Sequence, residues 1–473
     1  MASNGFALKW HISTDKSVKQ NRAAQWHPNA ESASPNSAFF GGAANCRQGG
    51  ELSILAPALG RSETRDLRPL MNPALTSLTL KRFRSLPSEQ VVFTNPSFLV
   101  GQNGSGKSNF VDAFAFLAEA MSSPLQAVFD RRGGISVVRN RSSGQSYPPN
   151  LGLGVTFGAI NGDITSARYA FEIRALKNYG FEVVREQCVI ERDGGSRDWF
   201  DRHGKKFESS GGKLDPSLES SALVLPIVGG DARFNAVFRC LSGMRVYSIE
   251  PAKLREMQDP DSGTSLRSDG SNTTSVLQEI ERQSRDDWKR ICELLETIVP
   301  KTKQVQAKKH GNKLSLEFTQ EWTGAKKMKF EAFSMSDGTL RALGLLTAVF
   351  QRPQPSVLVI EEPESTIHPG ALGAILDLLR HASRRMQVVV TTHSPELLDA
   401  EWIEDTNLKI VSWSEGATRI TEVSEASRQA LRQHLMGAGE LLRSNALTAP
   451  ANLFLDQNLN QRNLFVDFEG HLK

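Results

Sequence analysis

Apolar and polar positions alternate from residue 75 onward, and this pattern predicts the first strands of the chain. Strands are expected over Leu75–Phe83, Val91–Thr94 and Ser97–Val100, because successive side chains of a strand point to opposite faces. A glycine-rich turn follows, and the apolar spacing over Phe110–Ala120 predicts an amphipathic helix. A short apolar strand, a tight turn and a helix in this order indicate an α/β domain.

The middle of the chain has the pattern of an antiparallel sheet followed by helices. No heptad pattern persists there, which excludes long coiled-coil arms. A polar loop is expected over Asp193–Ser220, and a hairpin is expected around Gly311-Asn312. The predicted strands are Leu151–Ile160, Ala167–Ile173, Glu182–Ile190, Val305–Lys309 and Leu314–Thr319, and the predicted helices are Val276–Arg282 and Asp286–Ile298.

The last third alternates helices with short apolar strands. Helices are predicted over Ala342–Phe350 and Gly370–Ala382, and strands over Ser356–Ile360 and Gln387–Val390. Strands of this kind, each followed by a helix, favour a parallel sheet, whose strand ends open onto a ligand crevice.

These patterns divide the chain into four segments. The first, residues 1–70, is rich in Ser, Asn, Ala and Gly and has no sustained period, so it is expected to be a disordered extension. Alternatively, translation begins at Met71. Residues 71–150 are expected to form a first lobe with the glycine-rich turn, residues 151–330 a β-rich arm with a helical lid, and residues 331–473 a second lobe.

The net charge of +4 and the pI near 8.8 do not by themselves indicate a nucleic-acid ligand. Residues 1–70 carry eight Lys/Arg against five Asp/Glu, so the remainder of the chain is close to neutral. A lysine cluster in the middle of the chain is the best candidate for a DNA contact, although interspersed glutamates also fit an ordinary solvated hairpin. The cluster consists of Lys301, Lys303, Lys308, Lys309, Lys313, Lys326, Lys327 and Lys329.

Cysteine spacing and hydropathy limit the class of protein. The four cysteines stand far apart, without a CxxC pair or clustered histidines, so neither a zinc site nor a disulfide framework is expected. No apolar run approaches the ~20 residues of a membrane helix. A cytoplasmic protein without a membrane partner is therefore predicted.

The glycine-rich turn matches a phosphate-binding loop in full. Its pattern is G-x-x-x-x-G-K-[ST], and it stands between a predicted strand and a predicted helix. Glycines let the backbone amides face phosphates, a lysine can meet the β and γ phosphates, and a serine can hold magnesium. The predicted loop comprises Gly101, Gln102, Asn103, Gly104, Ser105, Gly106, Lys107 and Ser108.

Adjacent acids follow the strand Ser356–Ile360, in the run Glu361-Glu362-Pro363-Glu364. Neighbouring carboxylates at the end of a parallel strand repel each other unless a cation or a nucleophilic water lies between them. Glu361 is therefore predicted to support magnesium, and Glu362 to activate the water that attacks the γ-phosphate.

Two further segments complete an ordered set of motifs. Ser336-Asp337-Gly338 precedes the helix Ala342–Phe350, where Ser336 could also be an ordinary N-cap. His393 follows the strand Gln387–Val390, and an imidazole at a strand end can donate to a γ-phosphate or orient the attacking water.

Together, these motifs resemble the RecF-like and overcoming-lysogenization-type branch of SMC/ABC ATPases over Met71 to about Ala400. Two departures are the Glu at position 361, where most ABC proteins have Asp, and a signature that reads Met-Ser-Asp-Gly-Thr. No residue is assigned to the family's Q-loop glutamine. The resemblance implies an α/β P-loop NTPase of the ABC/SMC head type, with a mixed central sheet, an antiparallel β arm and a helical lid.

The resemblance also implies ATP and Mg²⁺ as cofactors and an ATP-driven homodimer. Ser336 and Gly338 of one copy would grip the nucleotide in the loop of the other, and hydrolysis would release the dimer. His393 matches the family's switch histidine. The basic residues of Leu80–Ser85 would approach the nucleotide base.

Three functions remain open at this point. The first is a RecF-like ATPase in DNA repair or in defence against foreign DNA, with a separately encoded nuclease or other effector. Only about 80 residues follow His393, which is too few for the Toprim nuclease domain that some relatives carry there. The second is a regulatory scaffold without DNA contact, and the third, less favoured, is the nucleotide-binding subunit of an ABC transporter.

Overall fold

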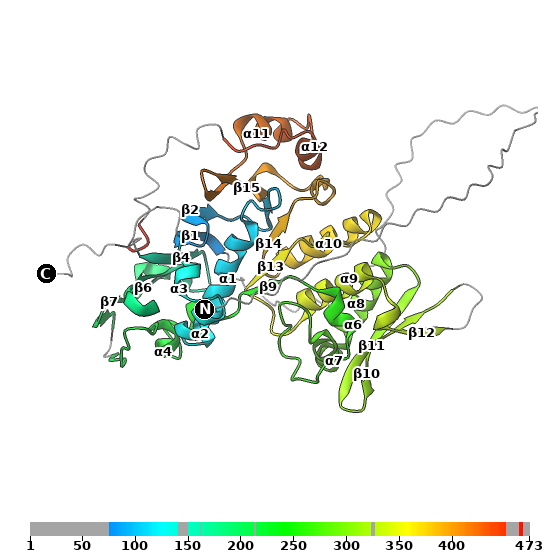
Figure 1. Cartoon of the computed structure of the whole chain (residues 1–473), viewed down its shortest axis with the longest axis horizontal. Helices are drawn as coiled ribbons and strands as arrows, with labels where there is room; N and C mark the ends of the chain where they lie inside the picture. Colours follow the sequence, from blue (N-terminus) through cyan, green and yellow to red (C-terminus); the bar gives the residue numbers. More distant parts are fainter. Residues whose placement is uncertain are drawn as a thin grey trace, which may run out of the picture. The chain divides into compact units, whose positions relative to one another are not determined.

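The computed structural model describes residues 75–140, 150–160, 162–211, 214–322, 327–450 and 463–466 (Figure 1). The predicted extension over residues 1–70 and Lys326 of the lysine cluster lie outside the described residues.

The central element is a mixed six-stranded sheet in the order β16-β15-β3-β14-β13-β9. Its neighbours pair in parallel except β16, which is antiparallel to β15. Its strands come from three of the predicted segments. They are β3 (Ser97–Val100), β9 (Arg245–Tyr247), β13 (Val357–Glu361), β14 (Gln387–Thr392), β15 (Leu408–Ser414) and β16 (Ala417–Thr421).

Both faces of this sheet are buried. Val357 and Val359 point into one hydrophobic core, while Leu358 and Ile360 point into a second core on the other face. This period of two explains why β13 is apolar at four successive positions.

The first core lies between the central sheet and a seven-stranded antiparallel sheet. Helix α1 (Lys107–Ser122) contributes Phe110, Phe114 and Phe116, all fully buried. Phe110 and Phe114 make an edge-to-face contact, with ring centroids 5.8 Å apart. In sheet order, the strands are β2 (Leu86–Val92), β1 (Leu75–Phe83), β4 (Leu151–Phe157), β5 (Ile164–Ala175), β6 (Phe181–Arg192), β7 (Arg197–His203) and β8 (Lys206–Ser209).

The second core is formed by helices α7 to α10 with a three-stranded antiparallel sheet. Trp288 of α8 is buried there, and its indole N–H donates to the carbonyl of Val305 (3.1 Å). The elements are α6 (Pro251–Arg255), α7 (Thr273–Gln283), α8 (Arg285–Ile298), α9 (Asp337–Phe350), α10 (Leu372–Ser383), β10 (Thr302–His310), β11 (Lys313–Gln320) and β12 (Met328–Glu331). The remaining α-helices are α2 (Leu125–Asp130), α3 (Ile135–Val138), α4 (Leu225–Val228), α5 (Asn235–Ser242), α11 (Glu425–Arg432) and α12 (Ala438–Arg443).

The predicted α/β fold with a mixed central sheet and an antiparallel arm is confirmed. The polar loop expected over Asp193–Ser220 is wrong in part, since β7 and β8 lie within it. Phe200 of β7 points inward and is fully buried. The next inward position, however, is Arg202. Its guanidinium donates to backbone carbonyls and lies 4.0 Å from the buried carboxylate of Glu186. A charged residue at an inward position hides the alternation that would predict a strand.

Candidate active site

The glycine-rich loop Gly101–Ser108 joins β3 to α1, as predicted. Gly106 has a φ of 100°, and a Cβ there would lie 1.8 Å from Oγ1 of Thr418. A Cβ on Gly101 would lie 2.3 Å from the carbonyl oxygen of Val411. Side chains at these two positions would collide with the β15–β16 hairpin, so glycine is required for the loop to keep its path.

Lys107 lies inside this loop. Its Nζ donates to the carbonyl oxygens of Gly101 (2.7 Å) and Gln102 (3.1 Å). Burial lowers the pKa of Lys107, while Glu362 and the other nearby glutamates oppose that shift. An anion at the loop would give this ammonium a stronger partner than two neutral carbonyls.

Ser108 and Glu361 meet although 253 positions separate them in the sequence. The hydroxyl of Ser108 donates to Oε2 of Glu361 at 2.7 Å. Magnesium is usually held by one or two protein oxygens together with substrate phosphates, which fits this pair. The described residues contain no group of three or more His, Cys, Asp or Glu that could hold a metal ion.

Glu362 and His393 form the second predicted pair. Nδ1 of His393 lies 3.2 Å from Oε1 of Glu362. The backbone of Glu362 is left-handed, with a φ of 44°, and its N–H donates to the carbonyl of Thr391 (3.0 Å). A residue with a Cβ atom is strained at a positive φ. Strained backbone conformations of this kind are found most often at functional sites.

Glu364 is a buried carboxylate to which the sequence assigned no role. Its Oε1 accepts a hydrogen bond from the hydroxyl of Thr392 (2.6 Å) and lies 4.0 Å from Nδ1 of His393. Its Oε2 is buried without a hydrogen-bond partner among the described residues. Burial raises the pKa of Glu364.

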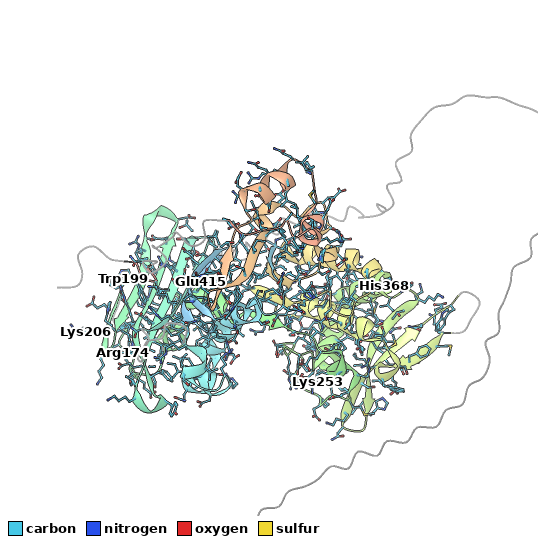
Figure 2. The ribbon with its side chains drawn as sticks, turned by 45° about the horizontal axis from the view of Figure 1, so that its top comes forward. Arg174, Trp199, Lys206, Lys253, His368 and Glu415 are labelled. Carbon is cyan, nitrogen blue, oxygen red and sulfur yellow. The ribbon has the colours of Figure 1, made fainter. Side chains whose placement is uncertain are left out.

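Ser336 and Gly338 lie at the start of α9. Ser336 is the N-cap of this helix, and its Oγ accepts from the N–H of Thr339 (3.2 Å). A Cβ on Gly338 would lie 2.6 Å from the carbonyl oxygen of Thr366, in the loop after β13 that is located by His368 in Figure 2. No hydrogen bond within the described part of the chain joins Ser336 or Gly338 to the loop Gly101–Ser108.

Arg341 connects α9 to the acidic strand, a contact that the sequence analysis did not find. Its guanidinium donates to the carbonyl oxygens of Glu362 (2.9 Å) and Ile249 (2.9 Å). Burial lowers the pKa of Arg341, and the carboxylates of Glu364 and Glu362 oppose this.

A second set of missed residues supports the loop from outside. The hydroxyl of Thr418 lies 3.0 Å from the carbonyl of Ser105 and 2.7 Å from the hydroxyl of Ser85. Asn109 of α1 donates to the same Ser85 hydroxyl at 2.8 Å. The β1–β2 turn and the β15–β16 hairpin, whose turn includes the labelled Glu415 in Figure 2, therefore fix the loop together.

A cleft of about 530 Å³ opens beside Ser108 and Glu361. Ser248, directly after β9, is one of its lining residues. The sequence did not predict β9, because a strand of three residues is too short to show an alternating pattern. Gln126, the first glutamine after α1, donates to Asp130 within α2 and does not line this cleft.

The described lysines of the predicted cluster are mostly paired with carboxylates. Lys308, for example, lies 3.0 Å from Glu331 and 3.4 Å from Glu317. The other pairs are Lys303 with Glu296, Lys313 with Asp259, Lys327 with Glu321 and Lys329 with Glu317.

The family model described as "AAA domain, putative AbiEii toxin, Type IV TA system" matches residues 97–399. This range contains the glycine-rich loop, Ser336 and Gly338, both glutamates and His393. No curated protein matches the sequence. No helix in the described ranges has the length and apolar character to cross a membrane.

Three solved head domains are similar in structure. An Smc head bound to the C-terminal winged-helix domain of ScpA is 14% identical, with a TM-score of 0.49 over 75% of this chain and 99% of that chain. An Smc head from Pyrococcus furiosus with an extended coiled coil, bound to the C-terminal domain of ScpA, is 12% identical, with a TM-score of 0.47 over 77% and 99%. The SMC head from Thermotoga maritima is 15% identical, with a TM-score of 0.38 over 74% and 99%.

Removal of the Thr418 hydroxyl is expected to loosen the loop. Thr418→Val should weaken nucleotide binding roughly 3- to 10-fold, because the carbonyl of Ser105 loses a hydrogen bond worth ~1 kcal/mol. Isothermal titration with a nonhydrolysable ATP analogue measures this. Thr421→Val on the same strand is the matched control, since its hydroxyl has no hydrogen-bond partner among the described residues. Equal affinities of the two variants would contradict the role of Thr418.

Proposed function

Since the family model covers more than half of its length, the chain belongs to this family of AAA domains, and we propose that it works as an ATP-driven dimer with two shared nucleotide sites. The match confirms the predicted assignment to P-loop ATPases of the SMC/ABC type, and the chain is an ATP-hydrolysing enzyme. In the proposed dimer, the loop Gly101–Ser108 of one copy and the segment Ser336–Gly338 of the other would enclose each nucleotide.

The observation that carries this proposal is the convergence of four side chains at one edge of the central sheet. Ser108 is hydrogen-bonded to Glu361, and Glu362 is paired with His393. Ser336 is exposed, and within the described residues its hydroxyl is bonded only to Thr339 of its own helix, which leaves its outer side open to a second copy.

Several residues of the chain would have separate roles in ATP hydrolysis. Glu362 would accept the proton of the attacking water, and His393 at 3.2 Å would orient this carboxylate or the γ-phosphate. Lys107 would exchange its loop carbonyls for phosphate oxygens. Ser108 and Glu361 are the residues that would hold magnesium, which, when bound, supplies charge to the β and γ phosphates.

A role in DNA repair or in defence against foreign DNA, together with a separate effector chain, is supported by the resemblance described above. The family description names a putative toxin, which is compatible with a defence function. The paired lysines favour a second candidate, an ATP-dependent scaffold that does not contact DNA through the β10–β11 hairpin. Lysines that are already paired have less to gain from phosphate contacts.

Glu362→Gln should abolish turnover while ATP binding is kept. The amide keeps the shape of the side chain but cannot accept a proton, so kcat should fall at least ~100-fold. A coupled assay of phosphate release measures kcat, and titration with ATP measures affinity. Glu293→Gln, at an exposed position on α8, is the control and should behave as wild type. Turnover by Glu362→Gln near the wild-type rate would show that another residue is the base.

If two copies share each nucleotide site, a mixture of two inactive variants should regain activity. Lys107→Ala should lose ATP binding, and Ser336→Arg should block the contact with the other copy's nucleotide, so each variant alone should be inactive. Random mixing would give about a quarter of the wild-type turnover, because each mixed dimer of a two-fold assembly keeps one intact site. If the mixture stays inactive while both variants remain folded, the shared site is wrong.

DNA dependence separates the two candidate roles. We expect ATP turnover to be unchanged by double-stranded DNA at both ~50 mM and ~200 mM salt, because most of the described lysines of the cluster are paired with carboxylates. Phosphate-release rates with and without DNA measure this. Stimulation that fades as the salt concentration rises would instead support the DNA-acting role.

A further inference from the structure

Residues Asn463–Val466, close to the carboxyl end, lie on the outer face of the seven-stranded sheet (Figure 1, red). The inner face is mostly apolar and packs on α1, as Leu78 and Leu80 do. The outer face carries the alternate positions of the same strands, including Thr79, which is only 6% exposed.

Leu464 fills a notch on this outer face. It is 1% exposed, and the floor of the notch is β4 at Gly152 and Gly154. A Cβ on Gly152 would lie 2.3 Å from Cδ1 of Leu464, and a Cβ on Gly154 would lie 3.1 Å from Cδ2. Any side chain at position 152 would therefore occupy the space of the leucine.

Gln187 of β6 binds the backbone of the segment at two points. Its Nε2 donates to the carbonyl of Val466 (3.0 Å), and its Oε1 accepts from the N–H of Val466 (2.8 Å). Asp201 of β7 fixes this amide, because its Oδ2 accepts from the same Nε2 (2.7 Å). The pair reproduces the two hydrogen bonds that an adjacent strand would offer.

Two arginines complete the contact. The guanidinium of Arg185 lies 4.3 Å from the ring centroid of Phe465 and is held in place by Asp201 (2.8 Å). Arg168 of β5 donates to the carbonyl of Asn463. Asn463 and Val466 are thus bound through their backbone, and Leu464 and Phe465 through their side chains.

We propose that the outer face of β4, β5 and β6 is a peptide-binding groove for a segment in which a leucine is followed by an aromatic residue, and that the chain's own residues Asn463–Val466 occupy it. Most of its contacts come from the three side chains Gln187, Arg185 and Arg168 and from the two-glycine notch, and Asp201 holds Gln187 and Arg185 in place. The groove is separate from the nucleotide site, and the inference does not depend on the proposed dimer.

The size of the contact makes the occupant exchangeable. One buried leucine, one ring contact and a few hydrogen bonds bind a free peptide weakly. The segment belongs to the same chain as the groove, so its binding is intramolecular, with a local concentration on the order of millimolar. The segment is therefore held by attachment rather than by intrinsic affinity.

A labelled peptide tests the groove in the full-length protein. The probe is a fluorescein-labelled peptide of residues 458–473, and its binding is measured by anisotropy. Leu464→Asp in the protein should release its own segment, so this variant should bind the peptide at least ~10-fold more tightly than the wild type does. A peptide that itself carries Leu464→Asp is the matched control and should not bind.

Two further variants, each combined with Leu464→Asp, locate the binding site. Gly154→Leu should fill the notch, and Gln187→Ala should remove two backbone hydrogen bonds; both should abolish peptide binding while ATP binding reports that the protein is folded. Equal peptide binding by the wild type and Leu464→Asp, or no effect of both groove variants, would overturn the proposal. If the wild type is a dimer and Leu464→Asp converts it to a monomer, the segment binds the groove of a second copy. That result would overturn the claim that the segment binds the groove of its own chain.

Discussion

The parallel pairing of β3 with β14, and of β14 with β13, is the constraint on which the site depends. It sets Val100 beside Thr392 and Glu361 beside Thr391, so the residues that follow each strand share one edge of the sheet. The loop after β3, the acids at the end of β13 and the histidine after β14 come together there without any further interaction. Burial of both sheet faces fixes this register, because a shift by one residue would exchange the side chains of the two cores.

Charge balance is the second condition at this edge. Three glutamates at positions 361, 362 and 364 lie close together, and the nearby cations are Lys107 from the loop and Arg341 from α9. Arg341 binds backbone carbonyls of the acidic turn rather than its carboxylates, which leaves Glu361 to Ser108 and Glu362 to His393. The left-handed backbone at Glu362 turns this carboxylate out of the strand direction, so the two neighbouring acids have separate partners.

The sequence predicted those parts of the site that are continuous in the chain. The loop Gly101–Ser108 has a complete motif, and β13 is an unbroken apolar run that ends in acids. The Ser85–Thr418 contact could not be predicted, because it joins single residues 333 positions apart and Thr418 belongs to no motif. Strand β7 was missed since Arg202 replaces an apolar residue at an inward position. The location of Ser336 at the start of α9 could be predicted, because serine is a favoured N-cap residue. The proposed contact of Ser336 with a second copy involves two chains, so a single chain does not contain it.

The notch at Gly152 and Gly154 links parts of the chain that are more than 300 positions apart. Glycine is a poor strand former, and alone it would be replaced readily by residues that favour strands. Here the absence of both side chains is the space that Leu464 fills, so a larger residue on β4 can be accepted only if residue 464 becomes smaller or leaves the sheet. Positions 152, 154 and 464 should therefore vary together among related sequences, and a covariation signal between this strand and the carboxyl end would be the evolutionary record of the contact.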